Sequence, residues 1–159
     1  MKQITEQEAY LRLTALCAQA EHCQYEMTEK MRRWELTEEA QARVMQRLVA
    51  ERYVDDERFA RAFVKDKVRY NKWGRRKVEQ ALWAKHIDEA IRQRVLDEVD
   101  DEEYITVLRP LLQQKRKSTK ANSDYELNGK LVRFAMSRGF TMDIIRQCIN
   151  VTDEDEFLE

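Results

Sequence analysis

One apolar pattern occurs three times along the 159-residue chain, and it limits the possible folds more than any other feature. Each copy has five apolar positions separated by steps of four, five, four and four residues. The copies are Met27, Met31, Leu36, Ala40 and Val44; Val78, Leu82, Ile87, Ile91 and Val95; and Leu131, Ala135, Phe140, Ile144 and Cys148. Steps of four keep side chains on one helix face, whereas the step of five marks a break. The pattern therefore predicts three similar helix pairs.

Polar residues stand where the two helices of each pair should separate. The N-caps expected for the second helices are Thr37, Asp88 and Thr141. Gly139, directly before the third break, suits a left-handed C-terminal cap. Glu35 and His86 occupy the matching positions of the other copies and suit such a cap less well.

A further helix is expected before each pair. Thr5 with Glu8 is typical of a capping box, and acidic runs at 55–57 and 100–103 suit two more helix starts. Pro110 should interrupt or kink the last of these helices. The repeat is therefore three helices, present three times, with expected boundaries at 1–54, 55–99 and 100–159. We expect an all-α, elongated and curved array, because stacked repeats contact mainly their neighbours.

The composition agrees with a helical protein. The three glycines, Gly74, Gly129 and Gly139, lie too far apart for a glycine-rich nucleotide loop, and the chain has one proline. So few turn-formers also argue against a β-sandwich or barrel. Charged residues make up 37% of the chain, but the apolar share of 43% is too high for wholesale disorder.

Nothing in the sequence suggests export, a membrane span or a metal. The first residues lack the apolar run of a signal peptide, and no stretch approaches the roughly 18 apolar residues of a membrane span. The cysteines Cys17, Cys23 and Cys148 are odd in number and lack metal-ligand spacing. We expect a cytoplasmic protein without disulfides, metal or cofactor, in which Cys17 and Cys148 are small core residues.

Charge is strongly segregated along the chain. Residues 58–77 carry nine basic residues and one acid, and residues 109–120 carry five basic residues and no acid. Residues 88–103 carry eight acids against two arginines, and residues 153–159 carry five acids. Dense basic segments predict polyanion binding, and Tyr70 and Trp73 could stack on bases. The alternatives are a solvated face neutralised by residues 88–103 and, for residues 115–120, a basic loop.

No catalytic constellation is recognisable. Cys23 adjoins His22, but adjacent helical residues point about 100° apart and do not form a nucleophile–base pair. Pairs of acids at 55–56 and 100–101 recur at helix starts, which favours capping over a unique site. A hydrolase using Asp55 and Asp56 is disfavoured because base, metal cluster and phosphate loop are absent from the pattern. The tryptophans, expected in packing roles, are Trp34, Trp73 and Trp83.

The second repeat carries a specific resemblance. Residues 53–64, which read Tyr-Val-Asp-Asp-Glu-Arg-Phe-Ala-Arg-Ala-Phe-Val, resemble the most recognisable motif of the RecX family. The basic stretch with Gly74 and the helix that follows, with Val78, Leu82, Lys85 and Ile87, continue the family pattern. Further similarity is found at His22-Cys23 with Met27, at 130–134 and at 138–140. Departures are His86 for the usual glycine, Ala81 for glutamate, and residues 34–36 for a basic-glycine-apolar turn.

The resemblance implies a non-enzymatic regulator of RecA, the recombinase that polymerises on single-stranded DNA. Such proteins lie in the groove of the RecA filament and mainly inhibit its ATPase, strand-exchange and co-protease activities, which affects recombination, DNA repair and the SOS response. The expected partner is thus the RecA filament, with single- or double-stranded DNA as a further one, and the expected state is a monomer. The alternative is a general single-stranded nucleic-acid-binding protein that competes with RecA for DNA.

Two basic clusters are the candidate RecA- or DNA-binding sites. The principal cluster is Arg69, Lys72, Arg75, Arg76 and Lys77. The second cluster is Lys115, Arg116, Lys117 and Lys120. Charge reversal at positions 75–77 together is expected to weaken binding without unfolding the chain.

Overall fold

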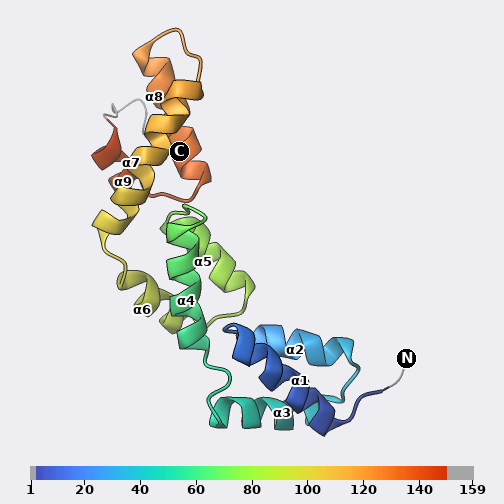
Figure 1. Ribbon diagram of the computed structural model, residues 1–159. Helices are drawn as coiled ribbons and strands as arrows, with labels where there is room; N and C mark the ends of the chain where they lie inside the picture. Colours follow the sequence, from blue (N-terminus) through green and yellow to red (C-terminus); the bar gives the residue numbers. More distant parts are fainter. Residues whose placement is uncertain (1–2, 150–159) are drawn as a thin grey trace. The chain divides into compact units, whose positions relative to one another are not determined.

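The computed structural model describes residues 3–149, which form nine α-helices and no strand within that range (Figure 1). The helices are α1 (Glu6–Gln19), α2 (Gln24–Arg33), α3 (Glu38–Ala50), α4 (Asp56–Arg69), α5 (Arg75–Ala84), α6 (Glu89–Asp97), α7 (Asp101–Ser118), α8 (Asp124–Ser137) and α9 (Met142–Cys148). The all-α repeat fold is confirmed. The boundaries at 54/55 and 99/100 stay a prediction, and the acidic segment 153–159 lies outside the described residues.

The step of five in the apolar pattern corresponds to one backbone hydrogen bond in each repeat. The N–H of Leu36, Ile87 or Phe140 donates to the carbonyl five residues earlier, at Met31, Leu82 or Ala135, over 3.1–3.2 Å. This is the six-to-one bond of a Schellman C-cap. The residues before them are left-handed, with φ of 61° at Glu35, 59° at His86 and 93° at Gly139. Glu35 and His86 therefore adopt the same left-handed cap as Gly139, although each carries a Cβ that this conformation disfavours.

Glycine at position 35 is expected to stabilise the chain. The left-handed conformation strains a residue with a Cβ, and Glu35 is exposed, so Glu35→Gly should raise the free energy of unfolding by about 0.5–1 kcal/mol. His86→Gly should gain less, because it also removes the ring of His86 from Tyr25, on which it stacks at 4.1 Å. Urea denaturation of both variants measures the difference. An unstabilised Glu35→Gly variant would contradict the assignment of strain.

Side chains cap several helices as expected. The hydroxyl of Thr5 accepts from the Glu8 N–H at 3.0 Å, and that of Thr37 accepts from the Ala40 N–H at 3.1 Å. Thr141 directly precedes α9, but its side chain makes no cap hydrogen bond. Helix α7 continues through Pro110, so the expected interruption does not occur.

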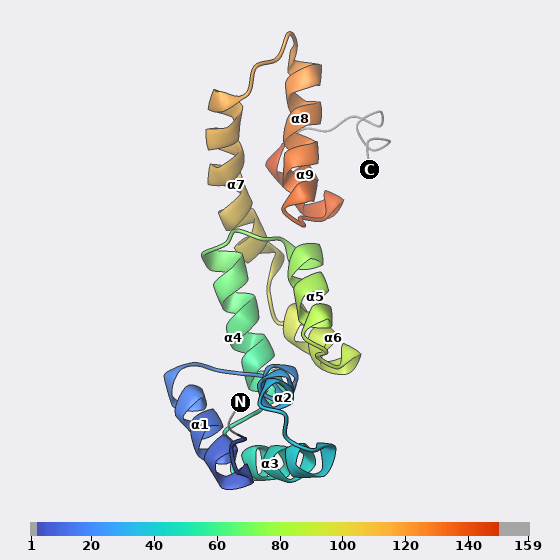
Figure 2. The same cartoon turned by 90° about the vertical axis from the view of Figure 1, so that its right-hand side faces the viewer.

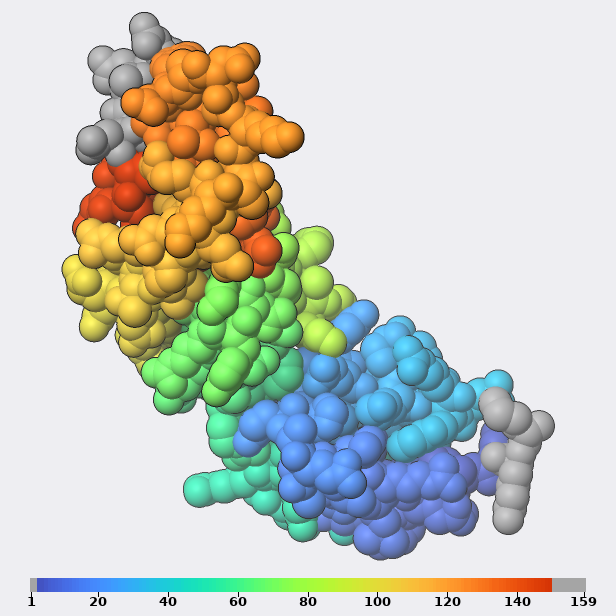
Figure 3. Space-filling model, turned by 45° about the horizontal axis from the view of Figure 1, so that its top comes forward, coloured from blue at the N-terminus to red at the C-terminus, as the bar shows by residue number. Residues whose placement is uncertain are grey.

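Two compact units make up the described chain. The first contains the residues up to Phe63 together with Leu82–Arg92, and the second contains Val64–Ala81 and the described residues from Gln93 onwards. In the first unit α3 contacts both α1 and α2 around one apolar core. In Figure 3 the side chains of α1–α3, coloured blue to blue-green, form a continuous surface. The core residues are Tyr10, Leu13, Met27, Met31, Val44, Leu48 and Val54.

The second unit is organised around α7. Helices α8 and α9 both contact α7, and α7 and α8 lie side by side in Figure 2. Tyr104 on α7 meets Phe140 edge-to-face, with ring centroids 6.5 Å apart. Both side chains are buried, which fixes the turn between α8 and α9 against α7.

In the second unit the start of α5 is joined to the end of α8 by backbone hydrogen bonds. The N–H of Gly74 donates to the carbonyl of Arg138 at 2.8 Å, and the N–H of Arg76 donates to that of Gly139 at 3.0 Å. A Cβ on Gly74 would lie 2.4 Å from the backbone nitrogen of Phe140. The two backbone segments approach so closely that only glycine fits at position 74 unless the segments move apart.

The first unit contains an equivalent contact. The start of α2 meets the end of α5: the Cys23 thiol lies 3.9 Å from the Lys85 carbonyl, and the Lys85 Nζ pairs with Glu26 at 2.9 Å. The ring of Tyr25 stacks on His86. Cys23 precedes Gly74 by 51 residues, and Lys85 precedes Arg138 by 53 residues. A helix start therefore meets an equivalent turn in both units, through backbone hydrogen bonds in the second unit and through side-chain contacts in the first.

Candidate polyanion-binding surface

Three cations and an aromatic ring are exposed around the loop between α4 and α5. Arg69 is at the end of α4, Lys72 is in the loop and Arg76 is in the first turn of α5, and all three side chains are exposed. Lys72 has a φ of 59°, which turns the chain so that the Trp73 N–H reaches the Lys67 carbonyl at 3.1 Å. Tyr70 is 79% exposed. We call Arg69, Tyr70, Lys72 and Arg76 the α4–α5 surface.

The other two members of the principal cluster have partners inside the second unit. Arg75 donates to Asp97 at 2.8 Å and to Gln93 at 3.0 Å, and its side chain is 29% exposed. The Nζ of Lys77 lies 4.7 Å above the centre of the Trp73 ring. The structure thus shows the alternative for Arg75: its charge is neutralised by an acid of the segment 88–103.

Trp73 packs in the loop. Its half-buried ring has Lys77 at 4.7 Å and Lys67 at 5.3 Å, so cations already contact its π-system. Of the two aromatic residues expected to stack on bases, Tyr70 is the exposed one. Trp83, expected in a packing role, is 68% exposed, which corrects that expectation.

The second basic cluster is mostly helical. Lys115, Arg116 and Lys117 form the last turn of α7, which corrects the alternative of a basic loop, while Lys120 follows in the connection to α8. The Nζ of Lys115 lies 4.9 Å from the centre of the Phe134 ring. The backbone carbonyl of Lys120 accepts from the Lys130 Nζ at 2.7 Å.

The two basic clusters lie at different places in the second unit. Arg69 lines a cavity of about 260 Å³ with Glu102 and Glu103 from the first turn of α7. Lys115 follows Glu103 by three turns, or about 18 Å along the helix axis at 1.5 Å per residue. Figures 1 and 2 show the C-terminal end of α7 away from the α4–α5 loop. A single small ligand therefore does not bridge both clusters.

The residues considered for catalysis have structural partners. Cys23 is fully buried, and burial raises the pKa of its thiol to about 11, so that it stays protonated at neutral pH. His22 contacts Glu26 at 3.1 Å. The carboxylates of Asp55 and Asp56 accept from the N–H groups of residues 58 and 24, at 3.0 and 2.9 Å. Asp55 caps the start of α4, as expected for acids at helix starts, whereas Asp56 caps the start of α2 and the side chain of Asp100, directly before α7, makes no cap hydrogen bond.

Two further features of residues 3–149 bear on function. No group of three or more histidine, cysteine, aspartate or glutamate residues there is placed to hold a metal ion. In the same part of the chain, every helix is too short or too polar to cross a membrane.

Two exposed aromatic residues could have been found from helix geometry. Tyr70 follows the buried Val68 by two positions, which places it about 200° around the helix from the core. Trp83 follows the buried Leu82 by one position, about 100° away. The hydrogen bond from the Arg138 side chain to the Asn71 carbonyl, at 3.3 Å, could not be predicted from the sequence, because it joins residues 67 positions apart.

Two family models match this chain. Residues 55–96 match the model described as RecX, second three-helix domain, and residues 101–149 match RecX, third three-helix domain. Together these segments cover more than half of the chain.

Curated relatives agree with the family models. The Regulatory protein RecX of Acinetobacter baylyi is 29% identical over 141 residues, which are 89% of this chain and 86% of that protein. The protein of the same name from Bacillus cytotoxicus is 24% identical over 150 residues, 94% of this chain but 56% of that protein. The chain thus spans about half the length of some of the relatives it matches.

Solved structures show the same fold. The crystal structure of RecX from Lactobacillus salivarius superposes with a TM-score of 0.81, at 19% identity, over 96% of this chain and 97% of that one. A crystal structure of regulatory protein RecX gives a TM-score of 0.82, at 16% identity, over 90% of this chain and 70% of that one. From the family matches and these likenesses we conclude that the chain belongs to the RecX family.

Proposed function

We propose that the chain is a non-enzymatic regulator that binds the RecA filament and lowers its ATPase, strand-exchange and co-protease activities. Membership of a family whose relatives are named regulatory proteins supports a regulatory role. The observation that carries the proposal is the α4–α5 surface, where three exposed cations and an exposed tyrosine stand together in residues 69–76. The chain acts as a monomer in the bacterial cytoplasm and needs no cofactor.

The α4–α5 surface suits an anionic partner. The side chains of Arg69, Lys72 and Arg76 can donate to carboxylates of RecA or to phosphates of the DNA within the filament, with little loss of internal contacts. Charge complementarity of this kind raises association rates and selects partners. The ring of Tyr70 adds apolar area that an exposed base or an aromatic side chain can cover. The second cluster, at the end of α7, provides a separate contact and so a second point of attachment.

A competitor for single-stranded DNA is the second candidate. The exposed Tyr70 beside basic residues favours it, because stacking on aromatic rings and phosphate contacts are how such proteins bind without sequence preference. It predicts binding to naked DNA with a log–log salt slope near −2, since each of three phosphate contacts on a single strand contributes about −0.7.

Titration of RecA's DNA-dependent ATP hydrolysis tests the proposal. The chain is added to RecA on single-stranded DNA, and its binding to naked DNA is measured at the same salt. Suppression at concentrations well below those that coat the DNA is expected for action on the filament. Suppression only when the DNA is saturated would favour the competitor, and no suppression at all would refute both.

A further inference from the structure

The hydroxyl of Tyr104 on α7 is buried, and it has no hydrogen-bond partner among residues 3–149. The whole residue is only 3% exposed. Buried hydroxyls in proteins are nearly always bonded to a protein group or to ordered water, because a buried donor without a partner destabilises the folded state. Burial also raises the pKa of Tyr104 to about 12, so the hydroxyl keeps its proton at neutral pH and can donate it.

Two other residues carry a buried polar atom without a partner, namely Oε2 of Glu21 and Nε of Arg92. Both side chains make a polar contact through another atom. Glu21 accepts from Arg58 at 2.6 Å, and Arg92 donates to the Ile87 carbonyl at 2.7 Å. The side chain of Tyr104 has one polar atom, so it is left without any hydrogen bond inside the described chain.

Tyr104 lines a small cavity in the second unit. The volume of this cavity is about 50 Å³. A water molecule needs roughly 10–15 Å³ of such space, whereas pockets for small organic ligands measure about 300–1,000 Å³. The cavity is therefore of the right size for one or a few water molecules. Its polar lining residues are Arg75, Asp101, Tyr104 and Thr141.

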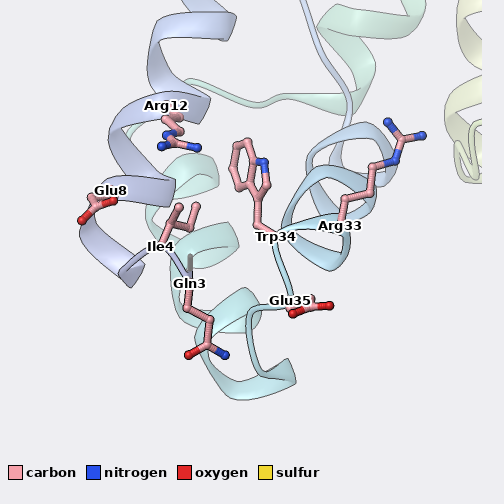
Figure 4. Close-up of a pocket in the computed structure, with 7 residues that line it drawn as sticks. All are labelled: Gln3, Ile4, Glu8, Arg12, Arg33, Trp34 and Glu35. Atoms are coloured by element: carbon pink, nitrogen blue, oxygen red, sulfur yellow. The ribbon is translucent and has the colours of Figure 1, made fainter. Parts of the chain in front are cut away.

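A larger cavity in the first unit, between the start of α1 and the end of α2, has no comparable polar group (Figure 4). Its volume is about 350 Å³, and the indole of Trp34 stands at its centre with Arg12 on one side. The guanidinium of Arg12 lies 5.6 Å from the centre of the Trp34 ring. None of the described side chains that line it has a buried polar atom without a partner. The smaller cavity is therefore the one whose chemistry calls for a ligand.

Thr141 supplies a second hydroxyl to the small cavity. It directly precedes α9, but its side chain makes no cap hydrogen bond. At the starts of three other helices the hydroxyls of Thr5, Thr37 and Ser123 each accept from the N–H three residues later, at 3.0–3.1 Å. The Thr141 hydroxyl makes no such bond and is available to a ligand in the cavity.

The charged groups of the lining favour a neutral ligand. Arg75 brings a guanidinium, which only donates, and Asp101 brings a carboxylate, which only accepts. The carboxylate would repel an anion, and the guanidinium would repel a cation. A small neutral molecule that both donates and accepts suits this pair, and water has these properties.

We propose that the cavity binds an ordered water molecule that joins the hydroxyls of Tyr104 and Thr141. The water accepts from Tyr104 and donates to Thr141, and its other hydrogen is directed to the carboxylate of Asp101. Three hydrogen bonds are typical of a buried water. The water connects the start of α7 with the start of α9, beside the edge-to-face contact of Tyr104 with Phe140. This site belongs to the second unit alone and does not depend on the proposed function.

Removal of the two hydroxyls, singly and together, tests the bridge. Tyr104→Phe and Thr141→Val nearly keep the shapes of the side chains, and each should raise the equilibrium constant for unfolding about fivefold, as expected for one lost hydrogen bond. The double variant should raise it by clearly less than the product of the two effects, about 25-fold, because both hydroxyls bind the same water. Urea denaturation measures these constants.

Tyr125→Phe is the matched control, because it removes an exposed hydroxyl from the same unit and should unfold like the wild type. An unfolding constant for Tyr104→Phe equal to or below that of the wild type would show that the hydroxyl has no partner in solution. Effects that multiply fully in the double variant would show that no water is shared. Either result would overturn the proposal.

A crystal structure of the wild-type chain, grown with bromide in place of chloride, identifies the occupant. A water is expected about 2.8 Å from the oxygens of both Tyr104 and Thr141, without an anomalous bromide signal. An anomalous peak in the cavity would show an anion instead. A direct hydrogen bond of the Tyr104 hydroxyl to Asp101, or a cavity without ordered density, would equally contradict the bridging water.

Discussion

Reversing the charge of Arg69, Lys72 and Arg76 together is expected to raise the concentration for half-maximal inhibition of RecA about 100-fold. Each side chain is exposed, and none forms an ion pair with another side chain of residues 3–149, in contrast to Arg75. Three acids in their place repel an anionic partner rather than merely failing to attract it. The free energy of unfolding should fall only slightly, because the hydrogen bond of residue 76 to Gly139 comes from the backbone, and solvent screens the repulsion of an acid at the exposed position 69 from Glu102 and Glu103.

A matched control reverses three other exposed cations, Arg52, Lys65 and Arg133, and so changes net charge by the same amount. It should retain most of the inhibition. If both triple variants lose inhibition equally, net charge decides the binding and the α4–α5 surface is not a specific site. Reversal at positions 75–77 is a poorer test, because it removes the contacts of Arg75 with Asp97 and of Lys77 with Trp73.

Gly74→Ala is expected to lower the free energy of unfolding by about 3 kcal/mol, at the upper end of the cost of inserting a methyl group where there is no space. The added Cβ would lie 2.4 Å from the Phe140 nitrogen and Cα, and 2.5 Å from the Gly139 carbonyl carbon. These are backbone atoms, so the segments must separate. Their separation weakens the bonds from Gly74 to Arg138 and from Arg76 to Gly139.

Denaturant unfolding of Gly74→Ala beside Asn71→Ala measures this effect. Asn71 is exposed in the same loop, and its contribution to the junction is its backbone carbonyl, which alanine keeps. Asn71→Ala should unfold near the wild-type midpoint. Equal midpoints for all three proteins would show that the junction tolerates a wider spacing than its geometry indicates.

The apolar periodicity was enough to predict the second and third helices of each repeat and the break between them. Steps of four follow helix faces, and the step of five coincides with the Schellman bond at Leu36, Ile87 and Phe140. The caps Thr5 and Thr37 were predictable because a hydroxyl before a helix can reach the N–H three residues later. All of these features depend on residues close together in sequence.

The candidate site was only partly predictable, because tertiary contacts decide which cations remain available. The sequence places Arg75 and Arg76 side by side, but Asp97 and Gln93 hold only Arg75. The left-handed backbone at His86 could not be predicted, because position 86 is not a glycine. The ring of His86 packs against Tyr25 in this strained conformation. Likewise, nothing in the spacing indicated that the turn at Trp34 lies beside a cavity.

The junction between α8 and α5 has an electrostatic consequence for the basic cluster. Helix α5 begins with Arg75, Arg76 and Lys77 and has no acid in its first turn, although cations at this end oppose the helix macrodipole. The Arg138 and Gly139 carbonyls, at the negative end of α8, accept from the N–H groups at the positive end of α5. The partial charges of the two ends offset each other. A helix can therefore start with consecutive cations, and Arg76 extends into solvent where an anion can reach it.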